Sequence, residues 1–512
     1  MPRKLLIPIL IAVSVASKAE VADTAASSGV MSRIELAESG LWRMTPDLYI
    51  NPAMKQWMLP VSVSAVNLSY ADARLNRAVY RAMGEGSQRW MAGAESYMKY
   101  RSSTLWGSAT YSNGKDRNPV WNESSDLDLI YPYVVADSIG GDIKAESYAL
   151  SGGYADHTDR WAWGATISYK AGLNYRNVDP RPRNVTGRLD LSAAGAWRVP
   201  STDYRLGLSA GYMRYKQSAD ITFVNDLADN RIWHLTGLGT HYERFTGQGY
   251  SHSYQGHRLS GSLDLLPQSG RGVSLSAGIE RFAFDHILTS LNNMPLQSAS
   301  ETMWRLEASW LRPGTCHDLA ATLSVRAGSR EGTENIFGDA AAGIYPKIGE
   351  LTMYRHSISR AMLRTLWQWH PSKAMRLAVE PRIGYSRSRQ TYADPWRLMQ
   401  IGTVDGGVDI SFSKLFGSRW RLRANLSAYG FVPSGCRIDF NLDGSAPLGM
   451  QKAETDSYDI LSSSHWQAGG SLAVVRSLTS RYALMLKADY RHGGYDCGVQ
   501  TNDFVLSFSF IF

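Results

Sequence analysis

The sequence predicts an all-β protein, a transmembrane antiparallel up-and-down β-barrel of about 16 to 18 strands, with about 18 favoured because such barrels have even strand numbers. Three observations predict this fold. Polar and apolar residues alternate in many segments, short polar turns alternate with long polar loops, and the chain ends on alternating aromatic residues. The mean hydropathy of −0.26 is too low for a bundle of membrane helices. Composition alone leaves an ordinary soluble all-β protein open as the alternative.

The N-terminus predicts export. Arg3 and Lys4 precede an apolar stretch at residues 5–16, and Ser17 and Ala19 place small residues at the −3 and −1 positions of a cleavage site. This pattern is typical of a signal peptide, here residues 1–19. We expect the cell outer membrane as the location after cleavage, because no apolar run of about 18 residues follows to span a membrane as a helix.

The segment from residue 204 shows the period-2 pattern most clearly. Apolar residues alternate with charged or small ones, so the two sets point to opposite faces of the strand. The apolar set is Tyr204, Leu206, Leu208, Ala210 and Tyr212, and the other set is Arg205, Gly207, Ser209 and Gly211. Segments that begin at residues 161, 420 and 482 repeat the pattern. A strand with lipid on one face and water on the other needs this alternation, and Tyr or Trp at its ends suits the two membrane interfaces.

The rhythm of the connections distinguishes a membrane barrel from a soluble sandwich, which also alternates. Short turns are predicted near 156–159, 200–203, 267–271, 312–315, 371–373, 416–418 and 478–480. Long loops are predicted near 113–142, 173–184, 217–253, 286–300, 330–352, 389–400, 431–462 and 492–499. Short periplasmic turns and long extracellular loops are typical of outer-membrane barrels. We therefore assign the barrel to residues 59–512.

The C-terminal strand carries the most specific signal. Phe504, Leu506, Phe508, Phe510 and Phe512 all fall on one face. This pattern resembles the terminal strand of outer-membrane barrels, in which alternating aromatic residues and a final Phe are presented to the barrel assembly machinery. The resemblance implies Phe508, Phe510 and Phe512 as the assembly signal. We expect outer-membrane lipid around the barrel, and the net charge of +8 is in keeping with a basic lumen or with contacts to lipopolysaccharide phosphates.

Over most of its length the chain resembles uncharacterised outer-membrane β-barrel families of Gram-negative bacteria. Asn51, Pro52 and Ala53 lie just before the first predicted strand. This element resembles the N-terminal segment of the long-chain fatty-acid transporter family, which plugs the lumen, and that of barrel proteins of the type IX secretion system. The resemblance implies that residues 20–58 form a periplasmic or lumen-plugging segment with these three residues as its hatch. A plain turn is the alternative, since Asn-Pro often begins one.

Many arginines fall on the predicted lumen faces, together with acidic residues. The lumen-lining candidates are Arg376, Arg382, Arg421, Arg423, Glu380 and Asp489. One interpretation is a polar pore with a mild anion preference, in keeping with the net charge of +8. The other is a network of ion pairs that fills and stiffens the barrel, which the interleaving of the two signs favours.

Residues 217–257 contain candidate ligands for a bound molecule: His234, His241 and His252, with His257, Asp226, Asp229 and Glu243 nearby. No HExxH or GxSxG motif frames them. We therefore predict no catalytic residue, no metal, no cofactor and no enzyme activity, and we keep ligand binding as the hypothesis for this loop.

The three cysteines are too few for a disulfide-dense scaffold. Cys436 and Cys497 lie in successive long loops, which emerge on the same side, whereas Cys316 lies in a short turn. A disulfide between Cys436 and Cys497 is therefore possible in an oxidising compartment. Three free thiols are the alternative.

Two classes of function remain open. The first is a channel or transporter for a small solute. The second is a structural or partner-docking barrel of a surface secretion or uptake assembly, whose partner could be a surface lipoprotein or a secretion protein. Nothing in the sequence favours nucleic acid as a partner.

Overall fold

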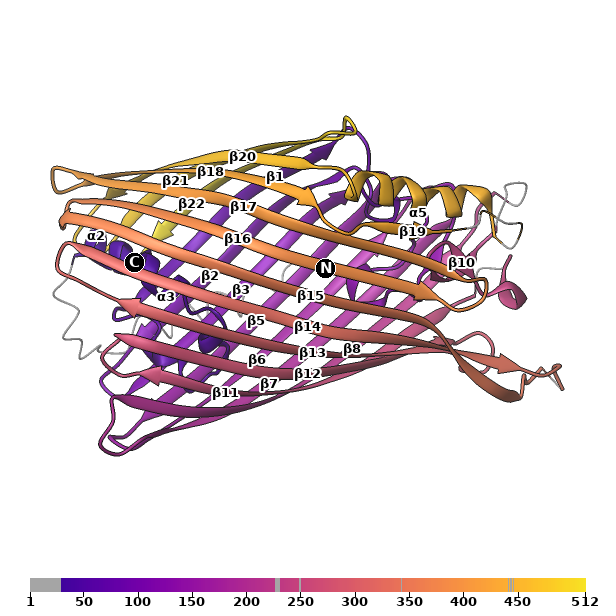
Figure 1. Ribbon diagram of the computed structural model, residues 1–512, viewed down its shortest axis with the longest axis horizontal. Helices are drawn as coiled ribbons and strands as arrows, with labels where there is room; N and C mark the ends of the chain where they lie inside the picture. The colour runs from indigo at the N-terminus through magenta and orange to yellow at the C-terminus, as the bar shows by residue number, and fades with distance from the viewer. Residues whose placement is uncertain are drawn as a thin grey trace.

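The computed structural model describes residues 29–225, 231–247, 250–341, 343–440, 442, 444 and 446–512. The predicted signal peptide, residues 1–19, lies outside them, as do Asp226 and Asp229. In the described part of the chain, eighteen antiparallel strands run up and down and close into a barrel (Figure 1). The predicted fold class is confirmed.

The barrel strands follow the chain order and all pair with their sequential neighbours in the wall. They are β1 (Val63–Leu75), β2 (Gly86–Lys99), β3 (Ser103–Asp116), β5 (Ile143–His157), β6 (Trp161–Tyr175), β7 (Arg181–Arg198), β8 (Tyr204–Thr222), β11 (His252–Pro267), β12 (Gly272–Leu288), β13 (Met294–Arg312), β14 (His317–Phe337), β15 (Lys347–Ser372), β16 (Met375–Tyr392), β17 (Arg397–Phe416), β18 (Trp420–Pro433), β20 (His465–Ser477), β21 (Ala483–Tyr495) and β22 (Gln500–Ile511). The short β19 (Arg437–Asp439) extends the pairing of β17 beyond β18.

The remaining elements lie in the connections and before the first strand. They are α2 (Val30–Ala37), α3 (Gly40–Arg43), η1 (Asp47–Ile50), η2 (Lys55–Trp57), η3 (Arg81–Met83), α4 (Leu127–Ile130), β4 (Val135–Ala136), β9 (Trp233–Gly237), β10 (Thr240–His241), η4 (Glu243–Phe245) and α5 (Leu448–Leu461). No helix in the described ranges is both long enough and apolar enough to cross a membrane.

The first and last strands close the barrel. β1 pairs with β22 in an antiparallel register that places Leu68 opposite Phe508 and Val66 opposite Phe510. The Phe510 ring stacks on Tyr482, with centroids 5.6 Å apart, and lies 5.9 Å from the Phe512 ring. Backbone groups in lipid have no water to bind, so the β1–β22 pairing removes the free edges that would be costly there.

The alternation seen in the sequence places apolar side chains on the outside of the barrel. Leu208, Leu259 and Leu426 are 66%, 65% and 64% exposed, whereas the neighbouring Arg205, Asp264 and Arg421 are buried inside. A band of this kind on a free-standing protein would be an aggregation hazard, and lipid is the medium that suits it.

Short and long connections alternate as predicted, but several predicted long loops are mostly strand. β12 continues to Leu288 and β13 resumes at Met294, so the predicted loop near 286–300 is short. Likewise, β14 and β15 take up most of the region near 330–352. The alternation of polar and apolar residues could not show where these strands end. A strand needs about 9–11 residues to cross a bilayer, but pairing continues beyond that length, and β15 alone has 26 residues.

Candidate functional site

The N-terminal segment, residues 29–62, lies inside the lumen at the end of the barrel that carries the short turns (Figure 1). We call this segment the inner plug. The Glu35 carboxylate at the end of α2 accepts hydrogen bonds from Arg376 at 3.2 Å and Arg421 at 2.7 Å. Glu38 forms an ion pair with Arg423. Three of the lumen arginines singled out in the sequence therefore hold the inner plug rather than line an open pore.

Asn51, Pro52 and Ala53 are buried against the barrel wall. The Asn51 amide donates a hydrogen bond of 2.8 Å to Asp264 on β11, and its oxygen accepts from the backbone N–H of Ala53 at 2.9 Å. On β6, a Cβ at Gly164 would lie 2.7 Å from the Pro52 carbonyl group. Glycine at that wall position therefore permits the close approach of the segment.

Further contacts fix the middle of the inner plug. Asp47 forms an ion pair of 3.1 Å with Arg326 on β14. The Met44 carbonyl accepts hydrogen bonds from Ser309 at 2.9 Å and from Thr322 at 2.6 Å. Hydroxyl groups of the wall thus supply hydrogen bonds to the buried Met44 carbonyl of the segment. Without these bonds, burying that carbonyl would cost free energy.

Two long connections at the opposite end fold back into the lumen. We call residues 117–142 and 231–247 the outer plug. β4 pairs with β9, and β9 pairs with β10, so the two connections share a small sheet. Tyr133 and Ile130 of this region pack on buried aromatic residues that point inward from β8, β11 and β12, namely Tyr215, Tyr254, Phe282 and Phe284.

A buried ion cluster joins the outer plug to the wall. Arg176, just after β6, donates to Glu123 at 3.0 Å and to Asp137 at 2.7 Å. All three side chains are 1% exposed. Burial, followed by the neighbouring Asp137 carboxylate, raises the pKa of Glu123, while Arg176 opposes that shift. The cluster therefore depends on its single arginine to balance two acids.

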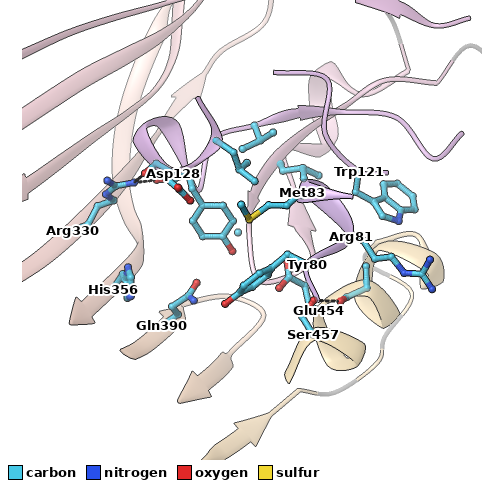
Figure 2. Close-up of a pocket in the computed structure, with 18 of the residues that line it drawn as sticks. Tyr80, Arg81, Met83, Trp121, Asp128, Arg330, His356, Gln390, Glu454 and Ser457 are labelled. Carbon is cyan, nitrogen blue, oxygen red and sulfur yellow. Dashed lines mark hydrogen bonds between the residues drawn. The ribbon is translucent and has the colours of Figure 1, made fainter. Parts of the chain in front are cut away.

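A cavity of about 390 Å³ lies between the outer plug, α5, the β1–β2 connection and the wall strands β13 to β16 (Figure 2). We call it the outer chamber. Its lining combines aromatic and sulfur-containing side chains with charged ones, namely Tyr80, Met83, Trp121, Tyr131, Met303, Met450, Asp128, Glu301, Arg330 and Glu454. Burial raises the pKa of Glu454 on α5 to about 7. The size and the mixed lining fit a site for a small organic molecule.

A second cavity, of about 540 Å³, lies in the middle of the lumen above the inner plug, whose Trp42 and Tyr49 contribute to its lining. Its wall carries ion pairs between Arg258 and Glu280 at 3.5 Å and between Arg188 and Asp190 at 2.8 Å. The polar lumen predicted from the sequence is therefore largely self-paired at this level.

A family model described as a family of unknown function, DUF6850, matches residues 52–512. The chain belongs to this family. Together with the closed barrel, this assignment confirms the prediction of an uncharacterised family of outer-membrane barrels. No curated protein matches the chain in sequence.

Solved barrels match this DUF6850 chain at low identity. The ferric-catecholate import receptor Fiu from E. coli K12 has a TM-score of 0.36 and 8% identity, over 87% of this chain and 81% of that one. BauA, the ferric preacinetobactin receptor from Acinetobacter baumannii, has a TM-score of 0.39 and 8% identity, over 88% and 80%. The monoaromatic hydrocarbon channel CymD has a TM-score of 0.31 and 11% identity, over 96% and 98%.

The other lumen candidates of the DUF6850 barrel lie on β16 and β21, which are not neighbours in the wall. The Arg382 guanidinium lies 3.6 Å from the centre of the Tyr429 ring. Asp489 forms an ion pair of 2.7 Å with Lys487 on the same strand. Glu380 on β16 lies opposite Asp409 on β17. These residues face the lumen, but they do not converge on one site.

The loop histidines come together in part. The rings of His234 and His252 lie 6.4 Å apart, and His286 of β12 lies 5.5 and 5.4 Å from them. His241 follows on β10 and is half-buried. Sequence reasoning missed His286, which lies at the start of a separate predicted loop, because nothing local shows that residues 231–247 fold onto it. In the described part of the chain, no three His, Cys, Asp or Glu side chains are placed so that they could hold a metal ion.

Acid should loosen the outer plug through His234. Neither of its ring nitrogens has a hydrogen-bond partner among the described residues. Burial, followed by the neighbouring His252 and His241, lowers the pKa of His234 to about 3. A solvent-exposed histidine has a pKa of about 6.5. The released loop therefore binds a proton more readily than the docked loop. The free energy that favours docking is greatest above about pH 6.5. It falls by up to about 1.4 kcal/mol per pH unit as the pH decreases towards about 3.

Amide hydrogen exchange in residues 231–247, corrected for its intrinsic pH dependence, measures this effect. Protection should fall between about pH 7 and about pH 4.5. His234→Phe keeps an aromatic ring in place and should reduce the fall. Equal protection at both pH values in the unmodified protein would contradict the expectation.

All three cysteines are free in the structure, which corresponds to the alternative kept beside the possible disulfide between Cys436 and Cys497. The Cys436 thiol donates to the Gly402 carbonyl on β17 at 3.5 Å. Cys497 accepts hydrogen bonds from Ser463 at 3.6 Å and from Arg77 at 3.8 Å. The two thiols emerge at the same end, as predicted, but each faces a different neighbour because Cys436 lies against β17 and Cys497 lies in the β21–β22 turn.

Proposed function

We propose that this barrel takes up a small solute through its lumen and that the inner plug is a displaceable hatch. The observation that carries the proposal is the inner plug itself. It fills the short-turn end of the lumen, and three of its acidic side chains, Glu35, Glu38 and Asp47, are held by wall arginines. Ionic contacts of this kind can exchange for contacts with water when the segment moves.

The two cavities support a route through the lumen. The outer chamber lies beside the outer plug, and the mid-lumen cavity lies above the inner plug. A solute could occupy the first before the second, with each plug closing one end. The arginine-rich lumen then has a gating role, because Arg376 and Arg421 hold the hatch.

Reversing the charge of Glu35 should open the barrel. In Glu35→Arg, a new cation would face Arg376 and Arg421, whose side chains are 16% and 3% exposed. Losing such a buried pair costs about 3–5 kcal/mol. A cost of that size shifts a closed-to-open equilibrium by more than about a hundredfold. We expect single-channel conductance in planar bilayers to rise strongly.

Two further variants sharpen this test. Deleting Asn51, Pro52 and Ala53 should also raise conductance, because it removes the contact with Asp264. Glu350→Arg is the matched control, since Glu350 is 61% exposed and pairs only with Lys347 in the ion pairs of the described residues. If correctly folded Glu35→Arg conducts no better than this control, the hatch is wrong.

The β14–β15 hairpin favours a second candidate function, the docking of a protein partner. It projects beyond the rest of the rim (Figure 1), and Ile344, Ile348 and Leu351 near its tip are 56%, 68% and 54% exposed. Apolar residues at an exposed tip are typical of interaction sites. A surface lipoprotein or a secretion protein would be a suitable partner, and a lumen that stays closed in both hatch variants would favour this alternative.

A further inference from the structure

Two acidic side chains of the outer chamber have no direct ionic partner among the described residues. Glu454 projects from α5 and Asp128 from α4, on different sides of the cavity (Figure 2). Within the described ranges, neither carboxylate forms a hydrogen bond or an ion pair with another side chain. Asp128 is exposed, whereas Glu454 is partly buried, and a buried charge is costly unless it is paired. Burial raises the pKa of Glu454, and the nearby charge of Arg397 offsets only part of that rise.

The basic groups of the outer chamber are already occupied. Arg330 donates to Glu301 at 2.6 Å and to the carbonyl oxygens of Asp128 and Tyr131 at 3.1 and 2.6 Å. Arg81 lies 3.9 Å from Asp456. His356 shares a hydrogen bond of 2.8 Å with Ser388. The charge left without a partner in the cavity is therefore negative, which disfavours an anionic ligand.

Aromatic rings lie beside the two free carboxylates. Tyr80 lies between the α4 side and the α5 side of the chamber, and Trp121 lines it near Arg81 (Figure 2). Tyr80 is 38% exposed and lines the cavity, so it offers accessible ring surface to a ligand. Aromatic faces attract cations and also cover the apolar body of a ligand.

We propose that the outer chamber binds an organic cation that has an apolar or aromatic body. Its ammonium or similar group pairs with Glu454, Asp128 adds negative charge from the other side of the cavity, and its body packs on Tyr80 and Trp121. The cation supplies the direct ionic partner that Glu454 lacks, and the cavity of about 390 Å³ has room for a molecule of this class. The inference rests on the proposed transport function only for the later passage of the ligand through the lumen.

Three probes of nearly equal shape test the ligand class by isothermal titration of the full chain in nanodiscs. Tyramine carries an ammonium group, tyrosol a hydroxyl group and 4-hydroxyphenylacetate a carboxylate on the same phenol. We expect tyramine to bind at least about tenfold more tightly than tyrosol, since a charge-assisted hydrogen bond contributes about that factor. The carboxylate should bind least. Equal binding of all three, or no binding of tyramine, overturns the inference.

Substitutions locate the site. Glu454→Gln should weaken tyramine binding about tenfold, Asp128→Asn should weaken it less, and both should leave tyrosol binding unchanged. Asp459→Asn is the matched control, because Asp459 is exposed on the same helix outside the cavity lining. Heat-modifiable migration on gels confirms that each variant is folded. Loss of affinity in the control as large as in Glu454→Gln would place the cation elsewhere.

The pH dependence gives an independent readout. Tyramine keeps its charge between about pH 5.5 and about pH 8, whereas Glu454 is neutralised at the lower value. Binding should weaken on acidification in the unmodified protein, and this dependence should be lost in Glu454→Gln. The test of the cation site and the test of the hatch can fail independently. If tyramine binds but Glu35→Arg does not conduct, only the transport proposal is refuted. If Glu35→Arg conducts but tyramine does not bind, only the cation site is refuted.

Discussion

Arg176→Ala is expected to release the outer plug from the barrel wall. Arg176 is the one cation among the described residues that pairs with the buried Glu123 and Asp137, at 3.0 and 2.7 Å. Its removal leaves two acids in a site from which water is excluded. Breaking a buried ion pair on one side costs about 3–5 kcal/mol, because the remaining charge is uncompensated. Amide hydrogen exchange in residues 117–142 should therefore accelerate strongly.

Arg181→Ala is the matched control for this change. Arg181 pairs with Asp179 at 2.6 Å, but its side chain is 41% exposed, and exposed pairs contribute at most about 1 kcal/mol. The wall hydrogen bonds remain in both variants, so heat-modifiable migration should persist. If exchange in residues 117–142 is the same in the two variants, the buried cluster does not anchor the outer plug.

Leu208→Arg is expected to impair assembly in the membrane. Leu208 lies on β8 midway between Tyr204 and Tyr212, opposite Leu263 on β11, and it is 66% exposed on the outer face. Arginine on the lipid face near the middle of a bilayer costs about 2–4 kcal/mol. The free energy of unfolding in lipid vesicles, measured by denaturant titration, should fall by that amount.

Ser209→Arg tests whether the face or the charge is responsible. Ser209 is the next residue of β8, and its hydroxyl group lies 2.6 Å from that of Ser262 inside the barrel. An arginine there reaches the polar lumen, so we expect a change of less than about 1 kcal/mol. Equal losses in the two variants would show that the faces of β8 are assigned wrongly.

The outer chamber illustrates what sequence reasoning missed. Tyr80 and Glu454 drew no attention in the sequence, because neither belongs to a motif. The run from Leu448 to Leu461 forms α5, and its position within a predicted loop concealed it. Its helical spacing of apolar residues was a usable signal, but nothing local showed that the helix would border a cavity with η3 and β15.

The sequence by itself determined the wall of this protein. Each strand has lipid on one face and the lumen on the other, so alternation is a local requirement that every segment must satisfy alone. The pairing that closes the barrel could be expected from the aromatic C-terminal strand. Tertiary structure alone decided how the lumen is filled. Glu35 meets Arg421 across 386 positions of the chain, and His286 meets His234 only because a loop folds inward. Contacts of this kind depend on where whole segments dock within the closed barrel, and no local period encodes that.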